Sequence, residues 1–83
     1  MHIEELRTYC LGLPQVEEKL PFDQSTLVFY IAGKMFCLCN INEFDSLNLK
    51  CDPDQALELR ATYEAVTPGY HMNKKHWNTI KIH

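Results

Sequence analysis

The sequence lacks a long hydrophobic run, and no apolar stretch approaches the roughly 18–20 residues that a membrane-spanning helix needs. A signal peptide is also missing, because the opening residues, MHIEELRTYC, are charged and amphipathic. These two absences argue against a membrane protein and against export. They predict a cytoplasmic protein with no membrane partner.

Familiar catalytic motifs are absent too: there is no G-x-S-x-G turn, no Walker loop, no H-E-x-x-H signature and no C-x-x-C pair. Four cysteines and four histidines would allow a Cys–His dyad, but only Cys51 has an activating context, directly before a predicted helix N-terminus. We interpret Cys51 as a core residue because it continues the inward face of Leu47 and Leu49. The sequence therefore predicts no enzymatic activity and no cofactor.

The chain contains four cysteines, and without an export signal their thiols are expected to be reduced. Cys37 and Cys39 are two residues apart, so they lie on the same face of a predicted strand. Free cysteine is among the most buried residue types, which favours a core role. A metal site and a disulfide are weaker alternatives, since a structural zinc site needs four ligands, usually in two close pairs. We expect no metal ligands.

Acidic residues are missing from residues 68–83, although the whole 83-residue chain carries a formal net charge of −3. An acidic chain argues against a dedicated, strongly cationic nucleic-acid binder. The local excess of Lys74, Lys75 and Lys81 still allows one basic face. The length suits a single small domain comprising residues 1–83, and we find no internal repeat or linker between domains.

Hydrophobic periodicity predicts two helices and an antiparallel sheet. Residues 2–11 have apolar positions at helical spacing, and Gly12 is expected to end this helix in a left-handed conformation. The linker that follows is expected to contain no regular element. Residues 25–41 alternate as a β-hairpin around Ala32-Gly33, with both faces apolar and therefore covered at least in part.

The second half of the chain continues this pattern. Residues 46–51 read as a third strand, and Asp52-Pro53 begins a second helix that runs to about Tyr63. Residues 67–70, TPGY, suggest a type II turn with Gly69 at its third position. A last strand is predicted over residues 77–83, and the whole pattern indicates the α+β class with an antiparallel sheet.

The unusual stretch is residues 68–80, PGYHMNKKHWNTI, which combines bases, amides and aromatic rings. Lysines there can neutralise phosphates, histidine and asparagine side chains can hydrogen-bond to phosphates or base edges, and rings can stack on bases. The predicted nucleic-acid-binding residues are Lys50, Tyr70, His71, Asn73, Lys74, Lys75, His76, Trp77 and Asn78. A structural reading is nearly as strong: Trp77 would pack in the core and the lysines would occupy a solvated turn, which would suit a protein-interaction or assembly module.

Four stretches together, LRTYCLGLPQVEEKLPF, TLVFYIAGKMFCL, LNLKCDPDQALELR and PGYHMNKKHWNT, resemble the MmcQ/YjbR family of small bacterial proteins. The resemblance covers nearly the whole chain. It implies a CyaY-like, that is frataxin-like, α+β fold with helices packed on one face of an antiparallel sheet. It also implies DNA binding through a "double-wing" arrangement of strands.

Members of this family normally continue for about thirty residues beyond the last strand, into a helix that covers the sheet. This sequence ends at His83, so we expect one face of the sheet to be open, or to be covered by a second copy in a homodimer. Frataxin-like iron binding is a weaker alternative, since only Glu4, Glu5, Glu17 and Glu18 resemble the acidic residues that such a site uses.

Overall fold

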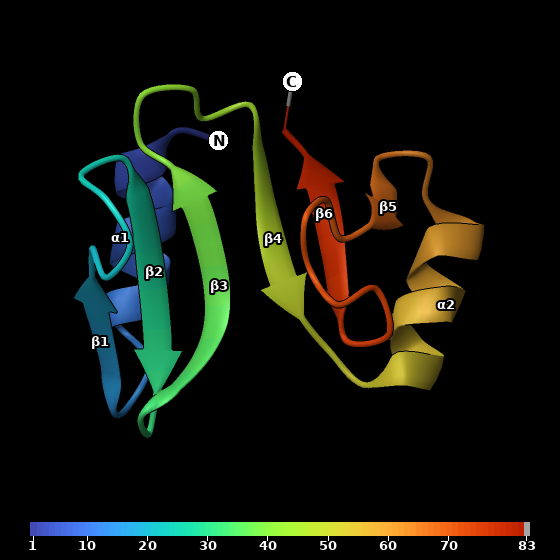
Figure 1. The fold of residues 1–83 in the computed structure, drawn as a ribbon, viewed down its shortest axis with the longest axis horizontal. Helices are drawn as coiled ribbons and strands as arrows, with labels where there is room; N and C mark the ends of the chain where they lie inside the picture. The colour runs from blue at the N-terminus through green and yellow to red at the C-terminus, as the bar shows by residue number, and fades with distance from the viewer. Residues whose placement is uncertain (83) are drawn as a thin grey trace.

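The computed structural model describes residues 1–82 and contains two helices and six strands (Figure 1). In chain order these elements are α1 (Ile3–Leu11), β1 (Val16–Lys19), β2 (Thr26–Ile31), β3 (Lys34–Asn40), β4 (Ser46–Lys50), α2 (Pro53–Thr62), β5 (Val66–Pro68) and β6 (Trp77–Lys81). The strands form one sheet in the order β1-β2-β3-β4-β6-β5, and every neighbouring pair is antiparallel. The predicted α+β class is confirmed.

The central hairpin follows from alternating apolar residues and a tight turn. Ala32 and Gly33 both have positive φ, 49° and 81°, as the two central residues of a type I′ turn require. Val28 and Phe29, which point to opposite faces of β2, are both fully buried. The prediction that this strand is covered on both sides is confirmed.

The helix ends follow local capping rules, with one correction. Asp52 caps α2, because its side chain accepts hydrogen bonds from the backbone N–H groups of Asp54 and Gln55 at 3.1 and 3.3 Å. At the end of α1, the left-handed conformation predicted for Gly12 is wrong: its φ is −76° and it continues the right-handed helix. Its N–H donates to the carbonyls of Thr8 and Tyr9, which satisfies the last turn without a left-handed residue.

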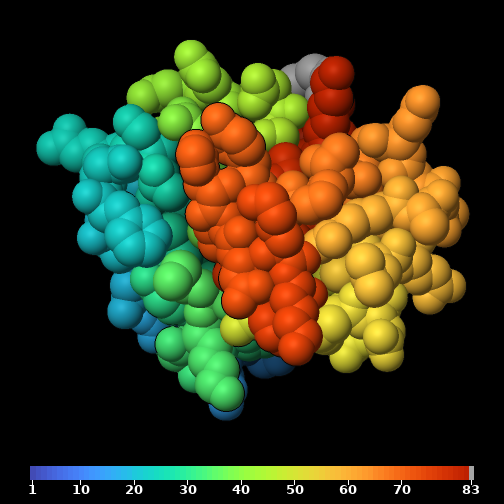
Figure 2. All heavy atoms as spheres, turned by 45° about the vertical axis from the view of Figure 1, so that its right-hand side comes forward, coloured from blue at the N-terminus to red at the C-terminus, as the bar shows by residue number. Residues whose placement is uncertain are grey.

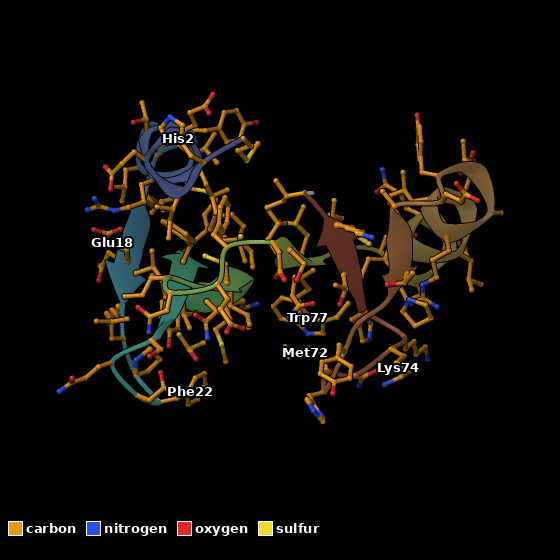
Figure 3. All side chains as sticks on the ribbon, turned by 90° about the horizontal axis from the view of Figure 1, so that it is seen from above. His2, Glu18, Phe22, Met72, Lys74 and Trp77 are labelled. Atoms are coloured by element: carbon orange, nitrogen blue, oxygen red, sulfur yellow. The ribbon has the colours of Figure 1, made fainter. Side chains whose placement is uncertain are left out.

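Both helices lie on the same side of the sheet, which we call the inner face (Figure 3). Leu6 and Cys10 of α1 pack with Leu27, Phe29 and Cys37 to form the main core. α2 lies beside β5 and β6 at the other end of the sheet. As predicted, the helices thus share one face.

Between the two helices, the inner face of the sheet is only half covered. Leu49 of β4 and Ile80 of β6 remain half-buried there, together with Ile82 just beyond the last strand. A homodimer that covers this region stays a prediction. His83, the end of the last predicted strand, lies outside the described residues.

The opposite side, the outer face, carries a row of side chains in register: Val28, Leu38, Asn48 and Thr79. The connection between β5 and β6, residues 69–76, folds back onto this face, and Figure 2 shows it in orange-red as a ridge across the surface. We call this connection the 69–76 loop. Within residues 1–82, neither helix is long and apolar enough to span a membrane.

Candidate nucleic-acid interface

The 69–76 loop is built by its own hydrogen bonds. The backbone carbonyl of Asn73 accepts from the N–H groups of His76 and Trp77 at 3.2 and 3.0 Å. The side-chain oxygen of Asn73 accepts from the N–H of Lys75 at 3.0 Å. The N–H of Met72 donates to the carbonyl of Gly69 at 3.3 Å. A loop closed in this way presents its exposed side chains from a fixed backbone.

Gly69 lets the start of the loop approach its end. A Cβ atom at Gly69 would lie 2.8 Å from the Cβ of Trp77 and 3.0 Å from its carbonyl oxygen. The Gly69 N–H donates to that same carbonyl at 2.9 Å. The predicted type II turn is therefore wrong: Gly69 does not have the positive φ that the turn requires, and the chain needs glycine here for close packing.

Arg60 of α2 makes hydrogen bonds to the C-terminal end of the loop and to the start of β6. Its Nε donates to Oδ1 of Asn78 at 2.6 Å, and its Nη2 donates to the carbonyl of Trp77 at 3.2 Å and to that of Lys74. The side-chain amide of Asn78 donates in turn to the carbonyl of Ala56 at 3.2 Å. One guanidinium thus joins the helix, the loop and the last strand.

Two rings lie exposed on the loop. Tyr70 is 71% exposed, and its ring centroid lies 4.0 Å from that of His71, with an interplanar angle of 51°. His71 has a φ of 58°, in the left-handed region that side chains rarely adopt. The N–H of Tyr70 donates to Oγ1 of Thr79 at 2.9 Å, and this hydroxyl donates to Oδ1 of Asn48 on β4. The ring pair is therefore tied to the outer face of the sheet.

Three lysines lie on or beside the loop. Lys74 and Lys75 are exposed on the loop, and exposed Lys50 is paired in register with Trp77 across β4 and β6. The ammonium of Lys74 donates to the carbonyl of Gly69 at 3.2 Å, which uses one of its three N–H groups. No acidic residue occurs within the loop, and within residues 1–82 none of these three lysines makes an ion pair.

Seven of the nine sequence-predicted site residues are exposed or half-buried: Lys50, whose register places it on the outer face, and six residues of the loop that folds back onto that face, Tyr70, His71, Asn73, Lys74, Lys75 and His76. The other two face the protein. Trp77 lies on the outer face of β6 but beneath the loop, with 7% exposure, and Asn78 points to the inner face with 1% exposure. In this arrangement Trp77 and Asn78 support the loop.

Sequence reasoning missed Arg60 and Gly69. For Gly69, the signal was only a glycine in the same short segment as the single tryptophan, since glycine lets the backbone pack closely against a large side chain. For Arg60, the signal was a charged residue on the apolar side of a predicted helix, together with an inward-facing asparagine on the last strand. A buried polar group needs a partner, and this pair satisfies that need.

The structure places the acidic and thiol side chains that the sequence offered for a metal site. Across residues 1–82, no group of three or more His, Cys, Asp or Glu side chains is arranged to hold a metal ion. Glu4 and Glu18, two of the acids considered for iron, both bind Arg7. The four cysteines are free thiols, and burial raises the pKa of Cys39 to about 11, so this thiol stays protonated at neutral pH.

The chain belongs to the YjbR family, whose sequence model matches residues 11–83. It is similar to YbdF of Escherichia coli O157:H7, a protein described as uncharacterized, with 41% identity over 78 residues, which is 93% of this chain and 64% of YbdF. It is 30% identical to the uncharacterized protein YjbR of Escherichia coli K12, over 99% of this chain and 70% of that protein.

A solved structure shows the same fold. The Deinococcus radiodurans protein DR2400, which contains a DUF419 domain, matches with a TM-score of 0.88 and 40% identity over 96% of this chain and 62% of that chain. The present chain thus spans less than two thirds of YbdF and of DR2400. The resemblance to the MmcQ/YjbR family is confirmed.

Proposed function

We propose that this protein binds nucleic acid through the 69–76 loop together with Lys50. The observation that carries the proposal is the exposed ring pair of Tyr70 and His71 on a hydrogen-bonded loop that also exposes Lys74 and Lys75 and contains no acid. Cations that neutralise phosphates, combined with exposed rings on which bases can stack, are the two components of a single-strand binding surface.

The exposed rings favour single strands over duplexes. Base–aromatic stacking needs an unpaired base, and it contributes about 1–3 kcal/mol per base. The side chain of Tyr70 is 71% exposed and the residue is held through its backbone N–H, so the part of the ring that does not face His71 can stack on a base. Trp77 is buried under the loop and takes no direct part.

The lysines should make binding depend on salt. If Lys50, Lys74 and Lys75 each neutralise one phosphate, the logarithm of the affinity should fall against the logarithm of salt concentration with a slope of about −2 for a single strand. With so few contacts, the dissociation constant should lie in the ~10⁻⁴–10⁻⁶ M range of non-specific binding.

The test is a fluorescence anisotropy titration of the protein into labelled single-stranded DNA, RNA and duplex DNA of equal length at several salt concentrations. The double variant Lys74→Ala/Lys75→Ala should bind more weakly and have a salt slope shallower by about 1.4. The control is Lys19→Ala/Lys34→Ala, which removes the same charge from β1 and from the first residue of β3, outside the 69–76 loop.

Tyr70→Ala should weaken single-strand binding by ~1–3 kcal/mol and leave the salt slope unchanged, because stacking is not a charge interaction. Absence of binding to any of these nucleic acids at 50 mM salt would contradict the proposal, as would equal losses in the test and control lysine pairs.

A further inference from the structure

A groove runs beside the 69–76 loop on the outer face. It has a volume of about 480 Å³ and lies between residues 70–72 and the strands β3 and β4 with their connecting residues. Leu38 and Met72 contribute apolar surface to it. Its polar walls are formed by Asn40, Glu43, Asp45, Asn48, Tyr70 and His71.

The groove is acidic, although the loop beside it is basic. The residues that line it include Glu43 and Asp45 but no lysine or arginine. Within residues 1–82 neither carboxylate makes an ion pair or a side-chain hydrogen bond, and both residues are exposed. The carboxylates are thus free to accept hydrogen bonds from a ligand.

Charges on this face are separated along the strands. Asp45 directly precedes β4 and Lys50 ends it, so the two backbone positions are roughly 16 Å apart at ~3.3 Å per residue. Lys74 lies toward α2, where its carbonyl meets Arg60, whereas Met72 lies nearer the middle of the sheet (Figure 3). Tyr70 and His71 belong both to the groove wall and to the exposed loop.

A nucleotide likewise has a charged part and a neutral part at some distance from each other. Its phosphate is an anion, which the lysines attract and the carboxylates repel. Its base is neutral, and cytosine, adenine and guanine carry exocyclic amines that donate hydrogen bonds, whereas thymine and uracil present carbonyl oxygens in their place. An ionised carboxylate only accepts hydrogen bonds, so it favours the amine-bearing bases and disfavours thymine and uracil.

We propose that this groove holds one unpaired nucleobase that carries an exocyclic amine. The base stacks on Tyr70 and donates to Glu43 or Asp45, while the adjoining phosphates lie toward Lys50, Lys74 and Lys75. This inference rests on the proposed function and adds selectivity for the base: the protein discriminates against thymine and uracil.

The experiment compares labelled single-stranded oligo-dC and oligo-dT of equal length, in 50 mM salt at pH 7.5, by fluorescence anisotropy. Oligo-dC should bind about fivefold or more tightly, which corresponds to the lower end of the discrimination given by one good base contact. The variant Glu43→Gln/Asp45→Asn keeps the side-chain shapes and removes both charges, so it should abolish this preference.

The matched control is Glu58→Gln/Glu64→Gln. It makes the same change in net charge at exposed positions on and just after α2, outside the groove, and it should retain the preference. Equal binding of oligo-dC and oligo-dT, or a preference that survives in Glu43→Gln/Asp45→Asn, would overturn the groove proposal and leave the proposed function standing. Absence of binding to both oligonucleotides would overturn the proposed function and this inference with it.

Discussion

The guanidinium of Arg60 lies against the side chain of Asn78, with 2.6 Å between Nε and Oδ1. Asn78 is almost completely buried, so this contact satisfies an acceptor that water cannot reach. The same guanidinium also donates to the carbonyls of Trp77 and Lys74. The exposed loop is therefore connected to the protein interior by one side chain of α2.

Arg60→Met should destabilise the protein by about 1–3 kcal/mol, because Oδ1 of buried Asn78 loses its partner. The amides of residues 74–78 should also exchange faster with deuterium, since the loop loses its attachment to α2. Thermal unfolding and hydrogen exchange measure the two effects. Leu57→Met, at a 61% exposed position of the same helix, is the control and should change neither. Unaltered exchange over residues 74–78 in Arg60→Met would show that Arg60 does not hold the loop.

Gly69→Ala should destabilise the fold by roughly 1–3 kcal/mol, because the new methyl group meets the Cβ and the carbonyl oxygen of Trp77. Both atoms belong to or adjoin the backbone, so a rotamer change cannot relieve the contact. Gly12→Ala, where the backbone is already right-handed helical, should stay within about 1 kcal/mol of wild type. Chemical denaturation compares the two variants, and equal midpoints would be inconsistent with this packing.

Trp77→Ala should cost about 3–5 kcal/mol, a large part of the total stability of so small a domain. Tyr70→Ala, which removes a 71% exposed ring from the same loop, should leave the melting temperature close to wild type. The burial of Trp77 can also be tested without mutation: its fluorescence should be poorly quenched by acrylamide. A freely quenched Trp77, or an unchanged melting temperature in Trp77→Ala, would mean that the loop does not cover this ring.

The ion pair between Arg7 and Glu18 should make stability depend on pH. Nε of Arg7 donates to Oε2 of Glu18 at 2.8 Å, and this hydrogen bond lowers the pKa of Glu18 below its usual value. A carboxyl with a depressed folded-state pKa stabilises the fold above its unfolded pKa, near 4.3, and loses that contribution as the pH falls through the folded pKa.

Glu18→Gln should therefore lower the melting temperature at pH 7, and the difference from wild type should shrink as the pH falls below about 4. Glu43→Gln, whose side chain has no such partner within residues 1–82, is the control for loss of a carboxylate. A deficit in Glu18→Gln that is the same at pH 3 and pH 7 would indicate that the ion pair does not contribute.

The sequence predicted the elements that have long, regular patterns. The hairpin of β2 and β3, the strand β4 and both helices were found because their apolar residues repeat at the expected periods. The strands β1 and β5 were missed. β1 is a four-residue, charged edge strand, and β5 is a three-residue edge strand that ends in Pro68. Edge strands of this kind carry little hydrophobic alternation, and their pairing depends on the neighbouring strand.

The sequence predicted which residues make up the candidate site but not which of them contact one another. Alternation correctly placed Trp77 and Thr79 on the same face of β6. It could not show that the 69–76 loop folds back over Trp77, because that contact depends on the close approach at Gly69. The partnership of Arg60 and Asn78 joins residues 18 positions apart in different elements, and local patterns do not encode such pairs.

The most direct test of nucleic-acid binding at this surface is to map it by NMR, titrating a short single-stranded DNA into ¹⁵N-labelled protein at low salt. Amide shifts should concentrate in residues 70–76 and 48–50, and they should weaken in Lys74→Ala/Lys75→Ala but not in Lys19→Ala/Lys34→Ala. The absence of shifts, or shifts concentrated on α1 and the inner face, would contradict the claim that the 69–76 loop is the nucleic-acid interface.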